Sequence, residues 1–281
     1  MILKWFPKEN RGLAMGIRQA GIPIGGALAG VLIPFLTVQY NMTYAINSIA
    51  CICIIGGVLF FVFYKEPYVQ EEARKGHIKI SFWMELKVVI CKKELYPIYI
   101  TGICMISLQM VLVGHFMKFL AGEQSITSIV AGTVFSVMFF SGMIGRVALA
   151  AISDVFYKGN RRIPLFIAVC ASIGLILLLV MSIHTITSGV LYSVSALLGF
   201  FSIGWFSLFI AEVAELASEE SVGITVSVAL TLNQIAIIVA PVLFGYIVDE
   251  KGYAYAWLCI VVLLSISAVS LYRRNKKIKE S

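Results

Sequence analysis

Residues 163–183 read IPLFIAVCASIGLILLLVMSI, a run without a single charged side chain. A helix rises 1.5 Å per residue, so about 20 residues cross the roughly 30 Å hydrocarbon core of a bilayer. Seven further apolar runs of similar length divide the chain almost from end to end. The candidate membrane spans are residues 12–38, 43–64, 96–119, 127–151, 163–183, 187–211, 223–248 and 253–271.

The composition agrees with a membrane protein and excludes a soluble domain of this size. Hydrophobic residues make up 60% of the chain, charged residues 13%, and the mean hydropathy is +0.94. Lipid offers backbone groups no hydrogen-bond partner, and these runs are about twice the length of membrane β-strands. The sequence therefore predicts an all-α, polytopic membrane bundle of eight transmembrane helices.

Lysine and arginine gather in every second gap between the spans. The alternate gaps contain only Lys118 and Lys251, and Arg18 and Arg146 lie inside spans. Basic loops stay on the cytoplasmic side, so we expect both termini and the long middle loop to be cytoplasmic, in a multi-pass protein of the plasma (inner) membrane. The net charge of +7 then reflects membrane topology. The basic residues form no single face, so no nucleic-acid partner is expected.

The only long hydrophilic stretch, residues 65–94, separates two spans from six. Residues 80–90 within it are expected to form a short amphipathic helix on the membrane surface. A six-helix half behind a central cytoplasmic loop is typical of transporters in which two bundles rock about a central site. We therefore divide the chain into the last two helices of a first bundle (1–64), the central loop (65–94) and a complete second bundle with a basic tail (95–281). On this interpretation an upstream four-helix segment is missing, through a truncated gene, a shortened gene model or a split protein.

Glycines crowd the first span. A helix-packing role is predicted for Gly12, Gly16, Gly21, Gly25, Gly26 and Gly30. Gly12, Gly16, Gly26 and Gly30 share one helical strip with Gln19 and Pro23, where another helix can approach to backbone contact. Two interpretations remain open: ordinary small-residue packing, or a helix that bends or slides as a cavity opens.

This region resembles the major facilitator superfamily. Residues 5–16, WFPKENRGLAMG, are similar to the cytoplasmic approach to that family's fifth helix. The glycines that follow resemble its antiporter signature, to which Gly12, Gly21, Gly25 and Gly30 conform. Gly26 stands where the signature has proline, and Ala29 where it has the first of two closing glycines. The resemblance extends over the whole chain, matched to helices five through twelve.

A second stretch resembles the loop signature after the family's eighth helix. The residues that match are Gly145, Arg146, Ser153, Asp154, Gly159, Arg161 and Arg162. The resemblance implies a conformational gate on the cytoplasmic side, in which the aspartate makes contacts that differ between states. A carboxylate near a helix end can hold arginine in one state and release it in another. A purely topological role for Arg161 and Arg162 is the alternative.

Polar residues inside the spans are candidates for a substrate cavity, because they tend to face protein or water rather than lipid. We select Arg18, Gln109, Ser202, Trp205 and Gln234. Gln109 lies on the third span and Ser202 and Trp205 on the sixth, which match cavity-lining helices of the family. Hydrogen bonding between helices is the alternative for these side chains. For Arg18 the alternatives are a pair with another helix or a side chain that reaches back to the interface.

These observations favour a secondary transporter that moves a small polar or anionic solute by alternating access, as a symporter or antiporter. The alternative is a non-transporting sensor or an inactive remnant with the same fold. The expected partners are the lipid bilayer, the solute and a coupling ion, either proton or sodium. Motifs of hydrolases, metalloproteases and nucleotide-binding enzymes are missing, and the six cysteines match no metal-site spacing. We therefore expect no enzyme activity, no cofactor and no metal.

Overall fold

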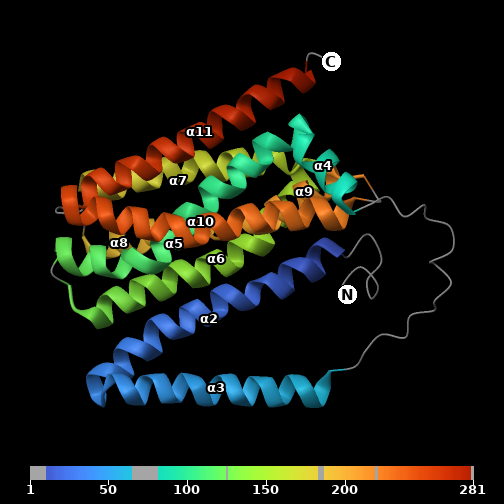
Figure 1. Ribbon diagram of the computed structural model, residues 1–281. Helices are drawn as coiled ribbons and strands as arrows, with labels where there is room; N and C mark the ends of the chain where they lie inside the picture. Colours follow the sequence, from blue (N-terminus) through green and yellow to red (C-terminus); the bar gives the residue numbers. More distant parts are fainter. Residues whose placement is uncertain (1–10, 65–81, 125, 183–186, 219–220, 280–281) are drawn as a thin grey trace.

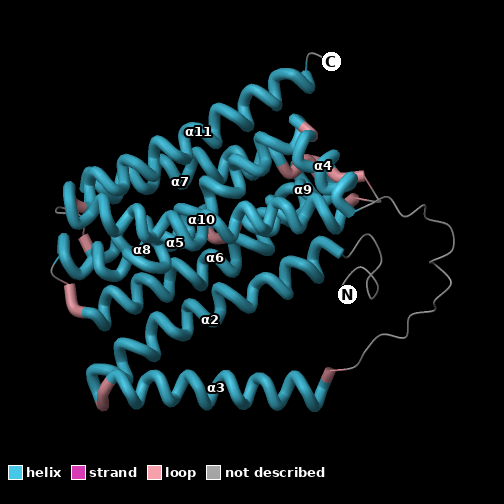
Figure 2. Tube along the Cα trace, in the orientation of Figure 1, coloured by secondary structure: helices cyan, strands magenta, loops and turns pink. Residues whose placement is uncertain are grey.

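The computed structural model of the protein describes residues 11–64, 82–124, 126–182, 187–218 and 221–279. In these ranges the chain is helical with short connections (Figure 2). The helices are α2 (Arg11–Gln39), α3 (Met42–Phe63), α4 (Phe82–Cys91), the short 3-10 helix η3 (Lys93–Leu95), α5 (Tyr96–Gln124), α6 (Ser128–Phe156), α7 (Arg162–Ser182), α8 (Ser188–Ser202), α9 (Trp205–Leu216), α10 (Val222–Lys251) and α11 (Tyr253–Lys279).

Within the described residues, eight helical stretches are long and apolar enough to cross a membrane, and they coincide with the eight predicted spans. α2 begins, and α3 and α11 end, at one side of the bundle (Figure 1). The all-α polytopic fold is thus confirmed. The helix expected over residues 80–90 is present as α4, whose Trp83, Met84 and Val88 are exposed.

Local chemistry explains where several helices begin and end. The Asn41 side chain accepts a hydrogen bond from the Tyr44 backbone at 2.8 Å, and Thr127 accepts one from Val130 at 3.4 Å. Both satisfy backbone donors that a helix start leaves without partners. α10 ends at Gly252, whose φ of +82° suits glycine and turns the chain directly into α11.

The sixth predicted span differs from expectation, because it is not one continuous helix. It breaks at residues 203–204 into α8 and α9. Around the break, glycines of α6 and α8 bring the two backbones together: a Cβ on Gly199 would collide with the Met138 carbonyl, and one on Gly145 with the Phe200 carbonyl. The second piece continues to Leu216 rather than ending at residue 211, which places Glu212 inside the helix.

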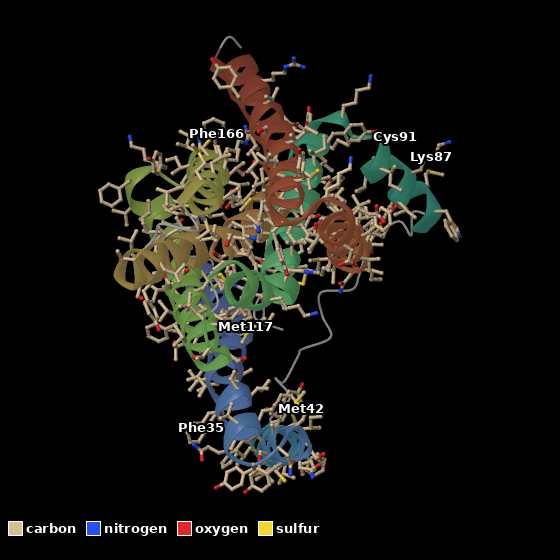
Figure 3. The ribbon with its side chains drawn as sticks, turned by 90° about the vertical axis from the view of Figure 1, so that its left-hand side faces the viewer. Phe35, Met42, Lys87, Cys91, Met117 and Phe166 are labelled. Atoms are coloured by element: carbon tan, nitrogen blue, oxygen red, sulfur yellow. The ribbon has the colours of Figure 1, made fainter. Side chains whose placement is uncertain are left out.

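The first two helices attach to the others mainly through α2 and α6, and α3 lies at the edge beside α2 (Figure 1). Figure 3 shows the α2–α3 hairpin, marked by Phe35 and Met42, projecting from the packed helices. The predicted glycine strip makes the contact between α2 and α6, because a Cβ on Gly26 would meet Phe139 and one on Gly30 would meet Ser136. The Ser136 hydroxyl also donates to the Ala27 carbonyl at 2.6 Å.

Two members of the predicted packing motif do not take part. Beyond the backbone of α2 itself and the adjacent residues, a Cβ built on Gly21 or Gly25 would meet no atom of the described residues within 4 Å. Both glycines are exposed, because the helical period turns them away from α6. Gly12 and Gly16 lie in α2, but their surroundings are outside the described part of the structure, as is the motif over residues 5–10.

Candidate functional site

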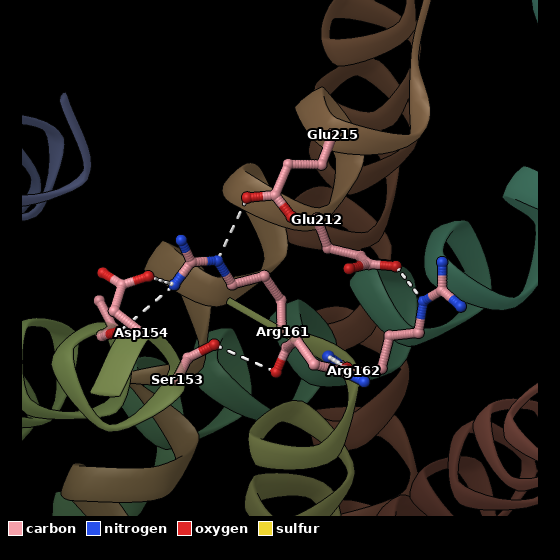
Figure 4. A network of polar contacts seen from close by, with 8 residues as sticks. Ser153, Asp154, Arg161, Arg162, Glu212 and Glu215 are labelled. Carbon is pink, nitrogen blue, oxygen red and sulfur yellow. Dashed lines mark hydrogen bonds and ion pairs between the residues drawn. The ribbon is translucent and has the colours of Figure 1, made fainter. Parts of the chain in front are cut away.

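Five charged side chains form an ion-pair cluster where α6, α7 and α9 end or begin (Figure 4). Its members are Asp154, Arg161, Arg162, Glu212 and Glu215. Asp154 lies in the last turn of α6, the two arginines at the start of α7, and the two glutamates in the last turns of α9.

The turn between α6 and α7 places both arginines. The Gly159 backbone N–H donates to the Ser153 carbonyl at 2.9 Å, and the Ser153 hydroxyl donates to the Asn160 carbonyl at 3.1 Å. Lys158 and Gly159 have positive φ angles of 50° and 82°, a conformation that glycine adopts without strain. The chain therefore reverses tightly, and Arg161 folds back onto α6, where it contacts Asp154 and the Ala150 carbonyl.

Arg161 joins three helices. Its Nη1 lies 2.5 Å from Asp154 Oδ1, and its Nε lies 3.3 Å from Glu215 Oε1. Its side chain is only 12% exposed, whereas both carboxylates are 52% exposed. These contacts link α6, α7 and α9 at this end of the bundle.

Arg162 and Glu212 form the more buried pair of the cluster. Arg162 Nε lies 2.5 Å from Glu212 Oε1, with side chains 20% and 5% exposed. Each ion loses hydration here, so each depends on the other for compensation. The loop residues predicted for the gate, Ser153, Asp154, Arg161 and Arg162, thus come together. Glu212 and Glu215, which sequence reasoning missed, supply the other two carboxylates of the cluster.

Gly145 and Arg146, the other two predicted gate residues, do not join the cluster. Eight residues separate Arg146 from Asp154 on one helix, about 12 Å along its axis. Gly145 packs against the Phe200 backbone. Its role in the structure is close contact between α6 and α8.

Arg146 is 1% exposed, and among the described residues it bonds to backbone carbonyls rather than to a carboxylate. Its Nη1 donates to the Gln19 carbonyl of α2 at 2.5 Å, and its Nε donates to the Ile203 carbonyl at the break between α8 and α9 at 3.2 Å. The guanidinium also lies over the Phe206 ring, 5.4 Å from its centroid. Arg146 therefore links the first two helices to the broken helix of the second part.

A second group of polar side chains lies buried between α5, α9 and α10. Trp205 Nε1 donates to Gln109 Oε1 at 3.2 Å, and both residues are buried. Trp205 packs on Phe209, with ring centroids 5.1 Å apart. Phe209 and Asn233 both pack on Gly102, where an added Cβ would meet both side chains. We call Gln109, Trp205 and Asn233 the buried polar group.

The Asn233 side chain is 2% exposed, and neither its Nδ2 nor its Oδ1 has a hydrogen-bond partner among the described residues. The hydroxyls of Tyr99, Ser195 and Ser202 are likewise buried and unpartnered there. A buried polar atom without a partner costs free energy. A water molecule or a polar solute that reached one of these atoms would supply the missing partner.

A pocket of about 720 Å³ lies between α4, α5 and α10. Tyr99 and Ile103 of α5 line one wall, and Ser227 and Thr231 of α10 line another. Tyr99 of the third span thus shares one pocket with Ser227 and Thr231 of the seventh, although the helices are distant in sequence; Gln109 and Asn233 are not among its lining residues.

The structure separates the five predicted cavity residues. Gln109 and Trp205 are in contact, and Ser202 is buried with an unpartnered hydroxyl. Gln234 is exposed, and its neighbour Asn233 takes the inner position. Consecutive residues lie 100° apart around a helix, so the sequence alone does not show whether Asn233 or Gln234 faces inward. The Arg18 side chain is outside the described part of the structure.

The eight apolar helices and the helix-end ion pairs define a polytopic α-helical membrane protein, integral to the membrane and multi-pass. Residues 1–241 match the sequence profile of the Major Facilitator Superfamily. The chain belongs to this family, as its resemblance predicted.

Individual relatives agree with this assignment. The chain is 25% identical over 271 residues to the hexuronate transporter of Bacillus subtilis, covering 90% of this chain and 62% of that protein. It is 25% identical over 297 residues to a probable galactarate/D-glucarate transporter of the same organism, covering 97% and 64%. The chain thus spans less than two thirds of the length of these curated relatives. Their names are those of transporters, in agreement with the expectation that the chain is not an enzyme.

A solved structure shows the same fold. The bacterial homologue of the human lysosomal transporter Spinster, in an inward-facing and unoccupied conformation, superimposes with a TM-score of 0.64 at 15% sequence identity. The match covers 98% of this chain and 73% of that chain.

Proposed function

We propose that the protein belongs to a secondary transporter that moves small anionic solutes by alternating access. The observation that carries this proposal is the buried polar group, in which Trp205 donates to Gln109 and the Asn233 amide lies unpartnered among the described residues. Polar side chains at membrane depth generally mark a solute pathway. Membership of the Major Facilitator Superfamily supports the same function.

The chemistry of the group favours sugar acids. Amide, indole and hydroxyl groups are neutral donors and acceptors that match the hydroxyls of a sugar chain. A carboxylate needs a cation in addition, and Arg18 in α2 is our candidate. The relatives named for hexuronate and for galactarate and D-glucarate carry solutes with both features. A proton or sodium ion as the coupling ion is part of the same proposal.

Alternating access requires two bundles that move against each other. We propose that residues 1–64 belong to the first bundle, residues 65–94 are the loop between bundles, and residues 95–281 are the second bundle. Four further helices would complete the first bundle, in keeping with the share of its relatives that the chain covers. The ion-pair cluster serves as the conformational gate at the cytoplasmic end.

Solute uptake tests this function. Liposomes containing residues 1–281 together with an upstream four-helix segment should show saturable uptake of glucuronate but not of neutral glucose. Gln109→Ala should weaken the apparent affinity roughly 2- to 13-fold, because it removes one neutral hydrogen bond. Gln234→Ala is the matched control: Gln234 is exposed, so no change is expected.

Two results would count against the proposal. If both glutamine variants behaved alike, Gln109 would not contact the solute. Uptake by residues 1–281 without the segment would show that four further helices are not required, or that a second copy supplies them.

The orientation in the plasma (inner) membrane is a separate prediction, based on the basic residues in alternate gaps. Reporter fusions at Ser281 and within residues 68–78 should read cytoplasmic, and fusions at Gly122 or Glu250 external. The physical reason is the cost of moving lysine and arginine across the membrane. An external signal at Ser281 would overturn the arrangement.

A further inference from the structure

A groove of about 980 Å³ borders the ion-pair cluster, with which it shares Arg162, and otherwise lies outside both sites described above. It runs between the start of α5, the end of α9 and residues 262–273 of α11, at the same end of the bundle as the ion-pair cluster. Its lining residues are Lys93, Glu94, Pro97, Arg162, Leu216, Val262, Ser265, Ile266, Val269, Ser270 and Arg273.

The floor of the groove is mostly apolar, and its length along α11 is close to the thickness of one leaflet of the hydrocarbon core. Val262, Ile266 and Val269 of α11 are exposed along it, and Leu216 of α9 lies opposite. From Val262 to Arg273 the helix rises about 16 Å. Half of the hydrocarbon core is about 15 Å, so an extended acyl chain fits this length.

The mouth of the groove is basic. Lys93 and Arg273 are exposed, and neither has a carboxylate partner among the described residues. Arg162 contributes a third cation, although Glu212 already partners it. Glu94 is the single acidic lining residue, and it lies 3.8 Å from Lys92. An excess of positive charge therefore faces the membrane interface, where lipid phosphates lie.

We propose that this groove binds an anionic glycerophospholipid, with its phosphate between Lys93 and Arg273 and one acyl chain along Val262, Ile266 and Val269. A free phosphate ion would use the mouth but not the apolar floor. A zwitterionic lipid would bring its own cation to a mouth that is already positive. An anionic headgroup with an acyl chain matches both the charge and the shape.

Selective lipid binding tests the proposal on the full chain. The purified protein in detergent would be titrated with equimolar phosphatidylglycerol and phosphatidylcholine, and bound lipid measured by native mass spectrometry. We expect preferential binding of phosphatidylglycerol. Lys93→Gln and Arg273→Gln should each weaken it about fivefold, and the double variant about 25-fold, from the usual contribution of one basic residue near an anionic membrane. Lys251→Gln, which makes the same charge change at the opposite end of the bundle, should have no effect.

Two further arms distinguish a lipid from its headgroup. Ile266→Trp fills the floor without changing charge, and it should also weaken phosphatidylglycerol binding. Free glycerophosphoglycerol, added in excess, should not displace the lipid. The proposal is overturned if the two lipids bind equally, if Lys251→Gln matches the groove variants, if Ile266→Trp has no effect, or if the free headgroup competes.

Discussion

Arg146→Met is expected to lower the transport rate of the complete transporter roughly 10- to 100-fold, while the protein still accumulates in the membrane. Arg146 connects α2 to the break between α8 and α9 through two carbonyls. A hydrogen bond from a charged group contributes about 1.5–3 kcal/mol. If one such bond forms in only one conformation, its loss shifts the conformational equilibrium by one to two powers of ten.

Two opposing contributions should leave the folding free energy of Arg146→Met close to that of the wild type. Removing the guanidinium leaves two carbonyls without their donor, at about 1–3 kcal/mol each. It also removes a cation whose placement at mid-membrane costs about 2.5–3.5 kcal/mol on insertion scales. The terms are of similar size, so we expect near-normal abundance.

Two variants sharpen this test. Arg146→Lys keeps the charge but has one nitrogen and cannot reach both carbonyls, so partial activity is expected. Ser207→Ala removes the 2.7 Å bond from the Ser207 hydroxyl to the Arg146 carbonyl, which lies within the second part of the chain. It should leave the rate within a few fold of the wild type. Uptake rates normalised to membrane abundance are the measurement, and a fully active Arg146→Met protein would refute the linking role.

Glu212→Gln is expected to lower the free energy of unfolding by about 3 kcal/mol, the lower end of the range for breaking a buried ion pair. Arg162 would keep its charge with its side chain only 20% exposed, and its carboxylate partner would be lost. Unfolding of the purified protein, followed by fluorescence in detergent, is the measurement.

The chain supplies a matched control. Lys92 and Glu94 form a pair at 3.8 Å with side chains 38% and 74% exposed. Glu94→Gln makes the same chemical change at a solvent-exposed pair, and it should lower the free energy of unfolding by at most about 1 kcal/mol. The double variant Arg162→Gln/Glu212→Gln should be only slightly less stable than Glu212→Gln alone, because the ion pair is already broken. Equal effects of Glu212→Gln and Glu94→Gln would show that burial does not strengthen the pair.

A substitution on the exposed side of the cluster can test the gate role without a large change in stability. The Asp154 side chain is 52% exposed, so Asp154→Asn should change stability little. As a gate contact it should still lower the transport rate, because it biases the equilibrium between conformations. Normal transport by Asp154→Asn would remove Asp154 from the gate.

The site could be predicted only in part. The turn residues Ser153, Asp154, Arg161 and Arg162 form one local motif, and the structure places them together. Glu215 and Glu212 reach the same cluster from a helix fifty or more residues further along the chain. The pattern of the sequence does not reveal them, because the predicted span ends at residue 211 and leaves both glutamates in the following loop.

The sequence by itself determined the eight spans, the helical class and the family, because a bilayer imposes a minimum length and an apolar composition on every crossing. It also identified the Gly26 and Gly30 strip, since helical period alone places small residues on one face. Only the tertiary structure decided that Arg146 bonds to carbonyls of two other helices, that Asn233 rather than Gln234 faces inward, and that Gly145 packs against Phe200. The physical reason is that the rotation and depth of each helix depend on side-chain packing against neighbours that are distant in sequence.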